Sequence, residues 1–313
     1  MKNLRWSRLG SIALLVLFFT LWSGPCAQAI SIIGAESGVQ TTYDRFVLGT
    51  YPVNPVPNPD FIAAPFDLSG VGWDVGDPAR AIAMISEQYF LCSAHFTPGG
   101  TLMFLSQSGV LHSYEVETTA FHRLIYDGSA GPKESDLAIG RLKNPISPAD
   151  EIGFVPILYL GETDIAQPES FEPYLGLSLL NLGHSRYGGG GANITLRLGT
   201  NTLDTVSEFS FGGAVTNIGI VFDQDPVTGE TLLQSGDSGS PTFGLKDGQF
   251  GLLGTHAGVA GNKSVDAFAA YTPYVTQIND WLRPANQSVS LVPEPGSAIL
   301  VLAALAAVAF RRW

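Results

Sequence analysis

Three residues lie in short sequence patterns that favour nucleophilic catalysis. Ser238 stands between two glycines in Gly-Asp-Ser-Gly-Ser-Pro, His95 follows small residues in Cys-Ser-Ala-His, and Asp136 opens the apolar run Asp-Leu-Ala-Ile. A serine hydroxyl is a weak nucleophile until a base removes its proton, and imidazole is the usual base. A carboxylate can then hold that imidazole in the correct tautomer. We therefore predict that His95, Asp136 and Ser238 form a catalytic triad.

The glycines around Ser238 add a second chemical feature. A serine in a tight glycine turn exposes its hydroxyl, and backbone N–H groups of the same turn can converge on one oxygen atom. We predict that the N–H groups of Gly236 and Ser238 form an oxyanion hole. Each pattern taken alone also fits a plain structural role, because glycine, serine and aspartate are the ordinary residues of turns.

The order and spacing of the three patterns resemble those of the chymotrypsin/trypsin-like serine proteases. The residues run His, Asp, Ser, with separations of 41 and 102 positions. Ser-Ala-His is similar to that family's Ala-Ala-His, and Asp-Leu-Ala-Ile is similar to its Asp-Ile-Ala-Leu. The resemblance covers residues 32–283 and implies an all-β fold of two packed six-stranded Greek-key β-barrels with a C-terminal helix. Two positions depart from the family, because Phe96 replaces a disulfide cysteine and Ser240 replaces a glycine.

The resemblance also implies where the substrate binds. It assigns Leu232, six residues before Ser238, to the base of the pocket for the substrate side chain. It assigns the strand containing Thr255, His256 and Ala257 to the substrate backbone, and Ala257 and Ala269 would narrow the pocket. Leu232 has no charge that could pair with lysine or arginine. The expected preference is therefore for apolar side chains of small to medium size.

A further implication of the resemblance concerns activation. In this family a new N-terminus of the form Ile-Ile-Gly folds inward, and its ammonium group pairs with the aspartate just before the nucleophile. Here those residues are Ile32, which opens Ile-Ile-Gly, and Asp237. We predict that export frees Ile32 to pair with Asp237. Two alternatives remain open: Ile32 begins an ordinary first strand, or signal peptidase cuts after Ala29 and a second protease removes the next two residues.

The composition supports a fold of short strands. The chain of 313 residues contains 36 glycines and 20 prolines, and only 14% of its residues are charged. Short apolar runs bounded by turn residues predict strands. These runs lie at 81–86, 101–105, 122–126, 137–142, 152–158, 177–182, 250–255 and 268–272. Apolar residues at helical spacing after Pro273, ending at Leu282, predict one helix.

Charge and cysteine content exclude several other functions. The net charge of −12 leaves no basic patch for phosphates, so we predict no nucleic-acid partner. Cys26 leaves with the N-terminal segment, so Cys92 is the single mature thiol and no intramolecular disulfide is expected. Asp223, Asp225 and Glu230 lack the spacing of a calcium loop. The chemistry needs neither a metal nor an organic cofactor, and we predict none.

The first residues predict a signal peptide, which we place at 1–31. Basic residues precede the apolar run 12–22, and small residues follow at Ala27 and Ala29, as at signal peptidase sites. A run this short favours cleavage over an uncleaved membrane anchor. The protein is therefore expected to be exported.

A second targeting segment ends the chain. Pro-Glu-Pro at 293–295 precedes the apolar run 296–310 and a basic end, Arg-Arg-Trp. Fifteen helical residues span roughly 22 Å, which is short of a bilayer core of about 30 Å. These parts resemble the PEP-CTERM sorting signal of Gram-negative bacteria. The resemblance implies an exosortase-type partner, contact with the membrane through the tail, and an envelope or extracellular location.

These features divide the chain into four segments and predict its function. A peptidase domain at 32–285 follows the signal peptide, a linker at 286–292 follows the domain, and the sorting signal with a short transmembrane segment occupies 293–313. The predicted function is a secreted serine endopeptidase that cuts protein or peptide substrates through an acyl-enzyme. The alternative is a catalytically silent protein of the same fold that serves in envelope or matrix adhesion. The intact triad favours the enzyme.

Overall fold

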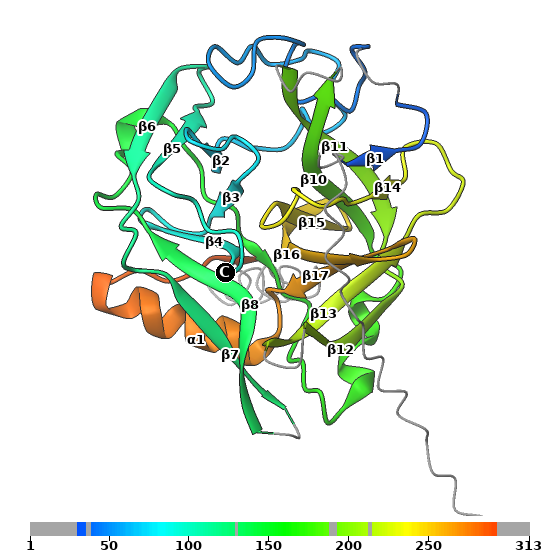
Figure 1. Ribbon diagram of the computed structural model, residues 1–313. Coiled ribbons are helices and arrows are strands. Elements are labelled where there is room, and N and C mark those ends of the chain that lie inside the picture. The colour runs from blue at the N-terminus through cyan, green and yellow to red at the C-terminus, as the bar shows by residue number, and fades with distance from the viewer. Residues whose placement is uncertain (1–29, 36–38, 129–130, 188–192, 212–214, 293–313) are drawn as a thin grey trace, which may run out of the picture.

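The computed structural model describes residues 30–35, 39–128, 131–187, 193–211 and 215–292. Within these ranges the chain forms many strands and one α-helix near its end (Figure 1). The predicted signal peptide up to residue 29 and the predicted sorting signal at 293–313 lie outside the described residues. No helix in the described part of the chain is both long enough and apolar enough to cross a bilayer.

The first half of the chain forms a closed barrel of six strands. They are β2 (Val71–Asp74), β3 (Ala81–Met84), β4 (Tyr89–Ser93), β5 (Thr101–Leu105), β6 (Leu111–Glu115) and β8 (Gly131–Arg141). Their order is β6-β5-β2-β3-β4-β8, with every pair antiparallel. The ring closes because Val116, just after β6, bridges to Leu142, just after β8. β7 (His122–Gly128) forms a hairpin with β8.

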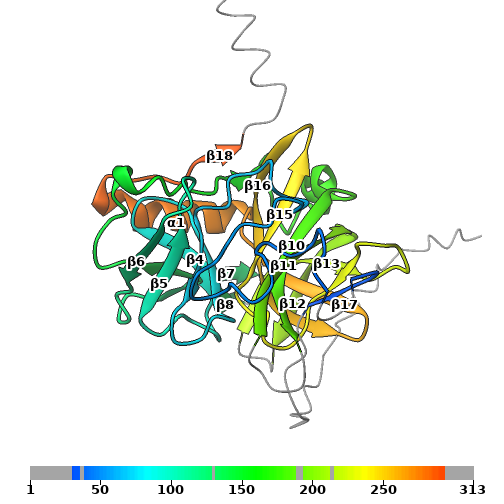
Figure 2. The ribbon, with the colours of Figure 1, turned by 90° about the horizontal axis from the view of Figure 1, so that it is seen from above.

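The second half forms another barrel beside the first (Figure 2). Its strands are β10 (Ser178–Tyr187), β11 (Asn193–Thr202), β12 (Thr205–Phe211), β13 (Val215–Asp223), β15 (Pro241–Lys246), β16 (Gln249–Ala260) and β17 (Lys263–Phe268). The order is β11-β10-β15-β16-β17-β13-β12. β12 follows β11 directly in the chain, so together they act as one bent strand that closes a ring of six. The predicted all-β fold of two six-stranded barrels with a C-terminal helix is confirmed.

The remaining elements are short. Their strands are β1 (Ser31–Ile32), β9 (Ile157–Leu158), β14 (Thr231–Leu232) and β18 (Leu291–Val292). Of these, β1 pairs with β14, β18 with β9, and β9 with β16 of the second barrel. Three short 3₁₀ helices lie at Pro148–Asp150, Pro168–Tyr174 and Arg283–Ala285. The barrels are linked directly by a parallel bridge between Val215 of β13 and Glu134 of β8.

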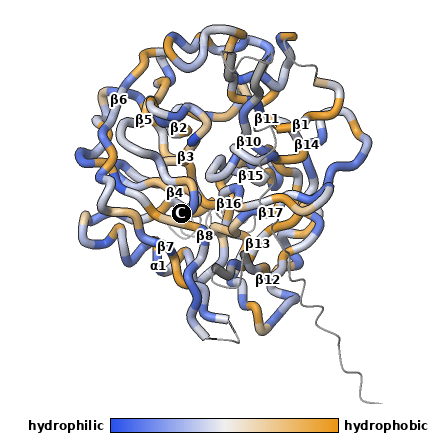
Figure 3. The backbone as a smooth tube through the Cα atoms, viewed as in Figure 1, coloured by the Kyte–Doolittle hydropathy of each residue, from blue (hydrophilic) through white to orange (hydrophobic). Residues whose placement is uncertain are grey.

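Strands β3 and β4 of the first barrel are buried on both faces, which explains their largely apolar sequences (coloured by hydropathy in Figure 3). In β4, Phe90 and Cys92 pack inside the barrel, while Leu91 joins the larger core that both barrels share. Successive side chains of a strand point to opposite faces, so burial on both sides requires apolar residues at every position. The hydrophobic effect contributes roughly 25 cal/mol per Å² of apolar surface buried. The end of β4, just before His95, is therefore held in place by tight packing.

The helix α1 (Thr272–Leu282) confirms the predicted helix and ties the end of the chain to the first barrel. Tyr274, Ile278 and Leu282 are fully buried. The side chain of Gln277 receives a hydrogen bond from the N–H of Ile125 in β7 at 2.8 Å and donates one to its carbonyl at 2.8 Å. These bonds extend the β7 edge and fix the helix against it.

Six of the predicted strand segments fall on strands, and two do not. The run 152–158 forms only the two-residue strand β9. The run 268–272 leaves β17 at once and turns into the start of α1. In both places the apolar residues are buried by tertiary packing in a turn or an extended segment, because short apolar runs do not specify strand pairing.

Packed residues lie beyond both ends of the predicted peptidase domain at 32–285. Ile30 is buried and Ser31 belongs to β1, so the folded domain begins before residue 32. The predicted linker at 286–292 is packed onto the domain, because β18 pairs with β9 and Val292 is 8% exposed. The sorting motif therefore follows directly after an ordered strand.

Candidate active site

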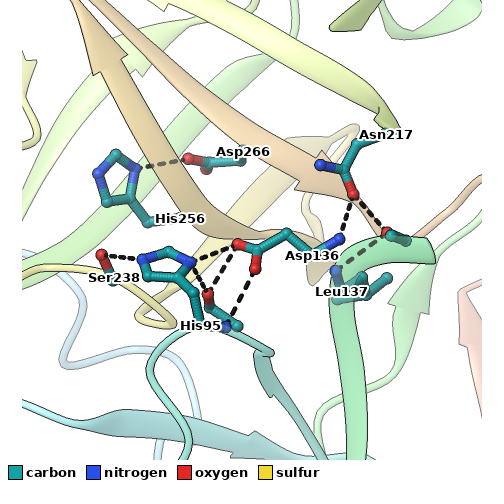
Figure 4. Close-up of polar contacts among 9 residues, drawn as sticks. His95, Asp136, Leu137, Asn217, Ser238, His256 and Asp266 are labelled. Atoms are coloured by element: carbon teal, nitrogen blue, oxygen red, sulfur yellow. Dashed lines mark hydrogen bonds and ion pairs between the residues drawn. The ribbon is translucent and has the colours of Figure 1, made fainter. Parts of the chain in front are cut away.

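The two barrels each supply part of the predicted triad. His95 follows the end of β4, and Asp136 lies in β8, which pairs with β4 so that Ser93 faces Leu137. Ser238 lies in the loop between β14 and β15 of the second barrel. The structure brings all three side chains together between the barrels (Figure 4).

Hydrogen bonds connect the three side chains in a row. Asp136 Oδ2 lies 2.7 Å from His95 Nδ1, and His95 Nε2 lies 2.8 Å from Ser238 Oγ. The N–H of His95 also donates to Asp136 Oδ1 at 3.1 Å. The Asp136 side chain is 3% exposed, whereas that of His95 is 45% exposed. A buried carboxylate therefore holds Nδ1 protonated, and Nε2 is left to accept the proton of the serine hydroxyl.

Glycine is required on both sides of Ser238 by the backbone of this loop. Gly236 has φ of 106° and Gly239 has φ of 82°, both in the left-handed region that side chains disfavour. A Cβ on Gly239 would lie 3.2 Å from the backbone nitrogen of Ser93, at the end of β4. The N–H of Gly239 donates to the carbonyl of His256 at 2.9 Å, which secures the loop to β16.

The backbone amides assigned to the oxyanion hole are available. No group among the residues that the structure describes accepts a hydrogen bond from the N–H of Gly236 or Ser238. The neighbouring N–H groups of Asp237 and Gly239, by contrast, are both used within the protein. Two unused donors beside Ser238 are what an oxyanion would need.

Asn217 is a residue of the site that the sequence did not reveal. Its side-chain oxygen accepts hydrogen bonds from the N–H of Asp136 at 2.6 Å and from the hydroxyl of Ser135 (Figure 4). Asn217 is fully buried in β13, so the second barrel holds the backbone of the first barrel's aspartate. The only sequence signal is an asparagine within an apolar strand, and such a residue usually marks a buried hydrogen-bond partner.

The loop after His95 is held without the disulfide that Phe96 removes. The Arg80 guanidinium lies 4.6 Å from the centre of the Phe96 ring and donates to the carbonyl of Thr97 at 2.6 Å. Asp74 accepts hydrogen bonds from the N–H of Gly99 and, at 2.6 Å, from the N–H of Gly76. Cation–π stacking and charge-assisted hydrogen bonds thus replace a covalent cross-link.

Cys92 is close to the site but chemically silent. Its side chain is fully buried inside the first barrel. Burial, together with the negative charge of Asp136, raises the pKa of the thiol well above its ordinary value. A thiol held in its neutral form is a poor nucleophile, so Cys92 does not compete with Ser238.

With the residues before Ile32 still attached, the structure places Ile30 beside Gly183 and Asp237, and the pairing of a freed Ile32 with Asp237 stays a prediction. A Cβ built on Gly183 would lie 2.8 Å from the Cβ of Ile30 and 2.8 Å from Asp237 Oδ1, so these two residues flank Gly183. Ile32 is two residues further along and pairs with Thr231 in the β1–β14 ladder. Because Ile32 is held within this strand, it is not the residue beside Asp237.

Asp237 itself is fully buried and accepts several hydrogen bonds. The N–H groups of His184 and Gln234 donate to its two oxygens, each at 2.8 Å, and His184 Nδ1 lies 3.3 Å from Oδ1. A buried carboxylate is tolerated only when donors or a cation compensate its lost hydration. The donors to Asp237 are two backbone N–H groups and the ring of His184, and a further cation beside it would stabilise its charge.

The predicted substrate-binding residues are only partly arranged as expected. The N–H of His256 donates to the carbonyl of Ser240 at 2.9 Å, and its ring bonds to Asp266 at 3.0 Å (Figure 4). Its backbone N–H and carbonyl are therefore occupied by the nucleophile loop and do not pair with a substrate. Ala257 lies at a β-bulge between His256 and Gly258, where the ladder skips one residue.

The other three residues of this group are half-buried or fully buried. Leu232 is half-buried in β14 and pairs with Ser31, while Ala269 is fully buried and its N–H bonds to the carbonyl of Leu253 at 2.7 Å. Thr255 is also fully buried, in the β16 ladder. None of these predicted pocket residues carries an acidic group, which is the feature that selection of lysine or arginine would need.

Comparisons with known proteins found distant structural similarity alone. No protein-family model and no curated protein matches the sequence. Among solved structures, a doubly substituted variant of human heparin-binding protein is similar with a TM-score of 0.48 and 12% identity, over 70% of this chain and 93% of that one. Neuropsin, a serine protease expressed in the limbic system of mouse brain, is similar with a TM-score of 0.43 and 14% identity, over 69% and 93%. At such low identities the likeness concerns the fold and not the chemistry of the site.

Replacing Asn217 by alanine should slow the reaction of Ser238 because Asp136 loses the acceptor that holds its backbone. We expect the rate of labelling by a fluorophosphonate to fall about 10- to 100-fold, the range that loss of alignment produces. Unfolding in urea should show a loss of about 1–3 kcal/mol from the buried donors left unpaired. Asn58→Ala is the control, because Asn58 is a buried asparagine that bonds to backbone carbonyls far from the triad. Equal labelling rates for Asn217→Ala and the native protein would contradict the assigned role.

Proposed function

We propose that this protein is a serine endopeptidase. The observation that carries the proposal is the His95 ring, which lies 2.7 Å from a buried carboxylate on one side and 2.8 Å from the Ser238 hydroxyl on the other. Such a row of carboxylate, imidazole and hydroxyl is the arrangement that activates a serine for acyl transfer. The triad residues come from three distant parts of the chain, so their alignment is a product of the whole fold.

The first half of the reaction follows from this geometry. Ser238 Oγ attacks the carbonyl carbon of the scissile bond while His95 Nε2 takes the hydroxyl proton. Asp136 stabilises the resulting imidazolium and keeps its own charge. General-base assistance of this kind contributes roughly 10²- to 10⁴-fold in rate.

The carbonyl oxygen becomes negatively charged as the bond to Ser238 forms. The unused N–H groups of Gly236 and Ser238 are the donors that would stabilise it, and removal of one such donor raises the barrier by roughly 3–4 kcal/mol. His95 then gives its proton to the leaving amine, which breaks the C–N bond and leaves an acyl-enzyme. Water, activated by the same ring, cleaves the ester and restores the serine.

We infer a preference for apolar side chains of small to medium size before the scissile bond. The support is the chemistry of Leu232, Ala257 and Ala269, which carry no charge; Leu232 is half-buried, and the two alanines are buried. His256 belongs to this neighbourhood, but its ring is held by Asp266.

We also infer that the mature chain begins at Ile30, after cleavage following Ala29. The structure supports Ile30 because it is buried beside Gly183 and Asp237. A free ammonium at Ile30 would place a cation beside the buried Asp237 and stabilise its charge. Because Asp237 directly precedes Ser238, this pairing would stabilise the nucleophile loop.

Export and sorting complete the proposal. The segment up to residue 29 would be removed by signal peptidase, and the tail at 293–313 would be recognised by an exosortase-type enzyme in the membrane. The protein would then act on proteins or peptides in the envelope or outside the cell. A silent adhesion protein of the same fold is the competing function, and it gives no reason for the aligned hydroxyl of Ser238.

A fluorophosphonate probe distinguishes the enzyme from the silent protein. We expect the mature protein to be labelled at Ser238, and Ser238→Ala to abolish both labelling and peptide hydrolysis while leaving the free energy of unfolding almost unchanged. Mass spectrometry of the labelled peptide identifies the modified residue. A folded, mature protein that takes up no label and cuts no peptide would support adhesion.

A library of fluorogenic peptides tests the substrate preference. We expect the highest kcat/KM for peptides with alanine, valine or leucine before the scissile bond, because the neighbouring side chains are apolar. Peptides with lysine or arginine at this position should be cut at least 10-fold more slowly, since no carboxylate is placed to pair with them. Cleavage mainly after lysine or arginine would refute the assignment of the pocket.

The mature N-terminus can be tested directly by sequencing the exported protein. We expect the sequence Ile-Ser-Ile-Ile-Gly. A recombinant chain that starts at Ile30 should react with the probe at least 10-fold faster than one that retains Ala29, because only the first has an ammonium group beside Asp237. An active exported protein that begins at Ile32, or equal rates for the two recombinant chains, would rule the assignment out.

A further inference from the structure

Ser93 is a buried polar residue in direct contact with two members of the triad. It is the last residue of β4, it is fully buried, and its backbone pairs with Leu137 in β8. Its hydroxyl oxygen lies 2.7 Å from Asp136 Oδ2 and 2.7 Å from His95 Nδ1. The mechanism described above makes no use of this hydroxyl.

The three atoms form a closed triangle, because Nδ1 and Oδ2 are also 2.7 Å apart. One N–H cannot point straight at two acceptors that lie in such different directions. The charged carboxylate is the stronger acceptor, so the Nδ1 proton is directed to Oδ2. The only acceptor that then remains for the Ser93 proton within this triangle is the same carboxylate oxygen.

Oδ2 of Asp136 therefore accepts two hydrogen bonds, one from the imidazole and one from the serine. The other oxygen, Oδ1, accepts the backbone N–H of His95. A carboxylate that shares its charge among several donors attracts each of them less strongly than it would attract one alone. Ser93 thus competes with the imidazole for the charge of Asp136.

We propose that Ser93 is a positioning residue of the triad. Its hydroxyl fixes the plane of the His95 ring and weakens the electrostatic attraction between Asp136 and the imidazolium. The proposal rests on the proposed function, because it assigns a role within that reaction. It adds a fourth side chain to the hydrogen-bonded row and explains why a polar residue stands fully buried at the end of an apolar strand. An alanine there would pack equally well and would lack the hydroxyl.

Removing the hydroxyl should change the pH dependence of the reaction. In Ser93→Ala the charge of Asp136 Oδ2 acts on the imidazole alone, so the protonated ring becomes more stable. The base form of His95 would then be populated only at higher pH. We expect the acid limb of kcat/KM against pH to move upward by roughly 0.5–1 pH unit, the size of effect that one hydrogen bond to a carboxylate produces. At pH values above the acid limb, kcat of Ser93→Ala should be severalfold lower than that of the native protein, while KM changes little.

Two matched variants separate this role from simple loss of packing. Ser93→Cys keeps a side chain of similar size with a weaker donor, so its acid limb should lie between those of the native protein and Ser93→Ala. Ser106→Ala removes another buried hydroxyl of the first barrel, one that accepts the N–H of Val110 far from the triad, and should leave the limb unchanged. An acid limb in Ser93→Ala that coincides with the native one would overturn the proposal, even if the variant were less stable.

A second readout works without catalysis. The ring protons of His95 can be followed by NMR against pH in Ser238→Ala, with and without Ser93→Ala. We expect the titration midpoint of this ring to move to higher pH when the hydroxyl is removed, in the same direction as the rate profile. If the native protein proves inactive but this shift is present, the proposed function fails while the contact of Ser93 with the ring stands. If the midpoint does not move, Ser93 has no influence on the ring and the proposal fails by itself.

Discussion

The whole site depends on keeping one carboxylate charged inside the protein. Asp136 is almost fully buried, and removing such a charge from water is unfavourable by several kcal/mol unless donors replace the lost hydration. The backbone N–H and the ring of His95 supply two of these donors, and the hydroxyl of Ser93 lies within reach as a third. The contacts that make the burial tolerable are the same ones that orient the imidazole, so stability and chemistry share one set of hydrogen bonds.

The distance between the side chains of His95 and Ser238 depends on how the two barrels are held together. His95 and Asp136 belong to the first barrel and Ser238 to the second, so a small rotation of one barrel would separate them. Asn217 opposes such a rotation because it reaches from β13 to the backbone of Asp136. Gln277 of α1 also links two elements, because its side chain forms hydrogen bonds with the backbone of β7. The two barrels approach each other closely at Gly239, which explains why this residue is a glycine. Any side chain there would press against the backbone of Ser93.

Covalent cross-links play no part in this arrangement within the described residues. Cys92 is a free, buried thiol, and the loop after His95 is held by Arg80 and Asp74. Both ends of the described chain are also packed: Ile30 is buried beside Gly183, and β18 adds a strand beside β9. Without disulfides among the described residues, the fold depends on such burial and hydrogen bonding for its stability.

The sequence by itself determined the residue types of the triad, their order, the glycine turn around Ser238, the terminal helix and the fold class. These follow from local patterns, since turn chemistry and helical spacing act over a few residues. Tertiary structure decided that Asn217 reaches Asp136 across 81 positions, that Ile30 and not Ile32 lies beside Asp237, and that residues 268–272 leave the sheet. Even Ser93, two positions from His95, shows its contact with Asp136 only once β4 and β8 are paired. A short sequence pattern fixes a conformation, whereas the partner of a buried polar group is chosen by the packing of segments far apart in the chain.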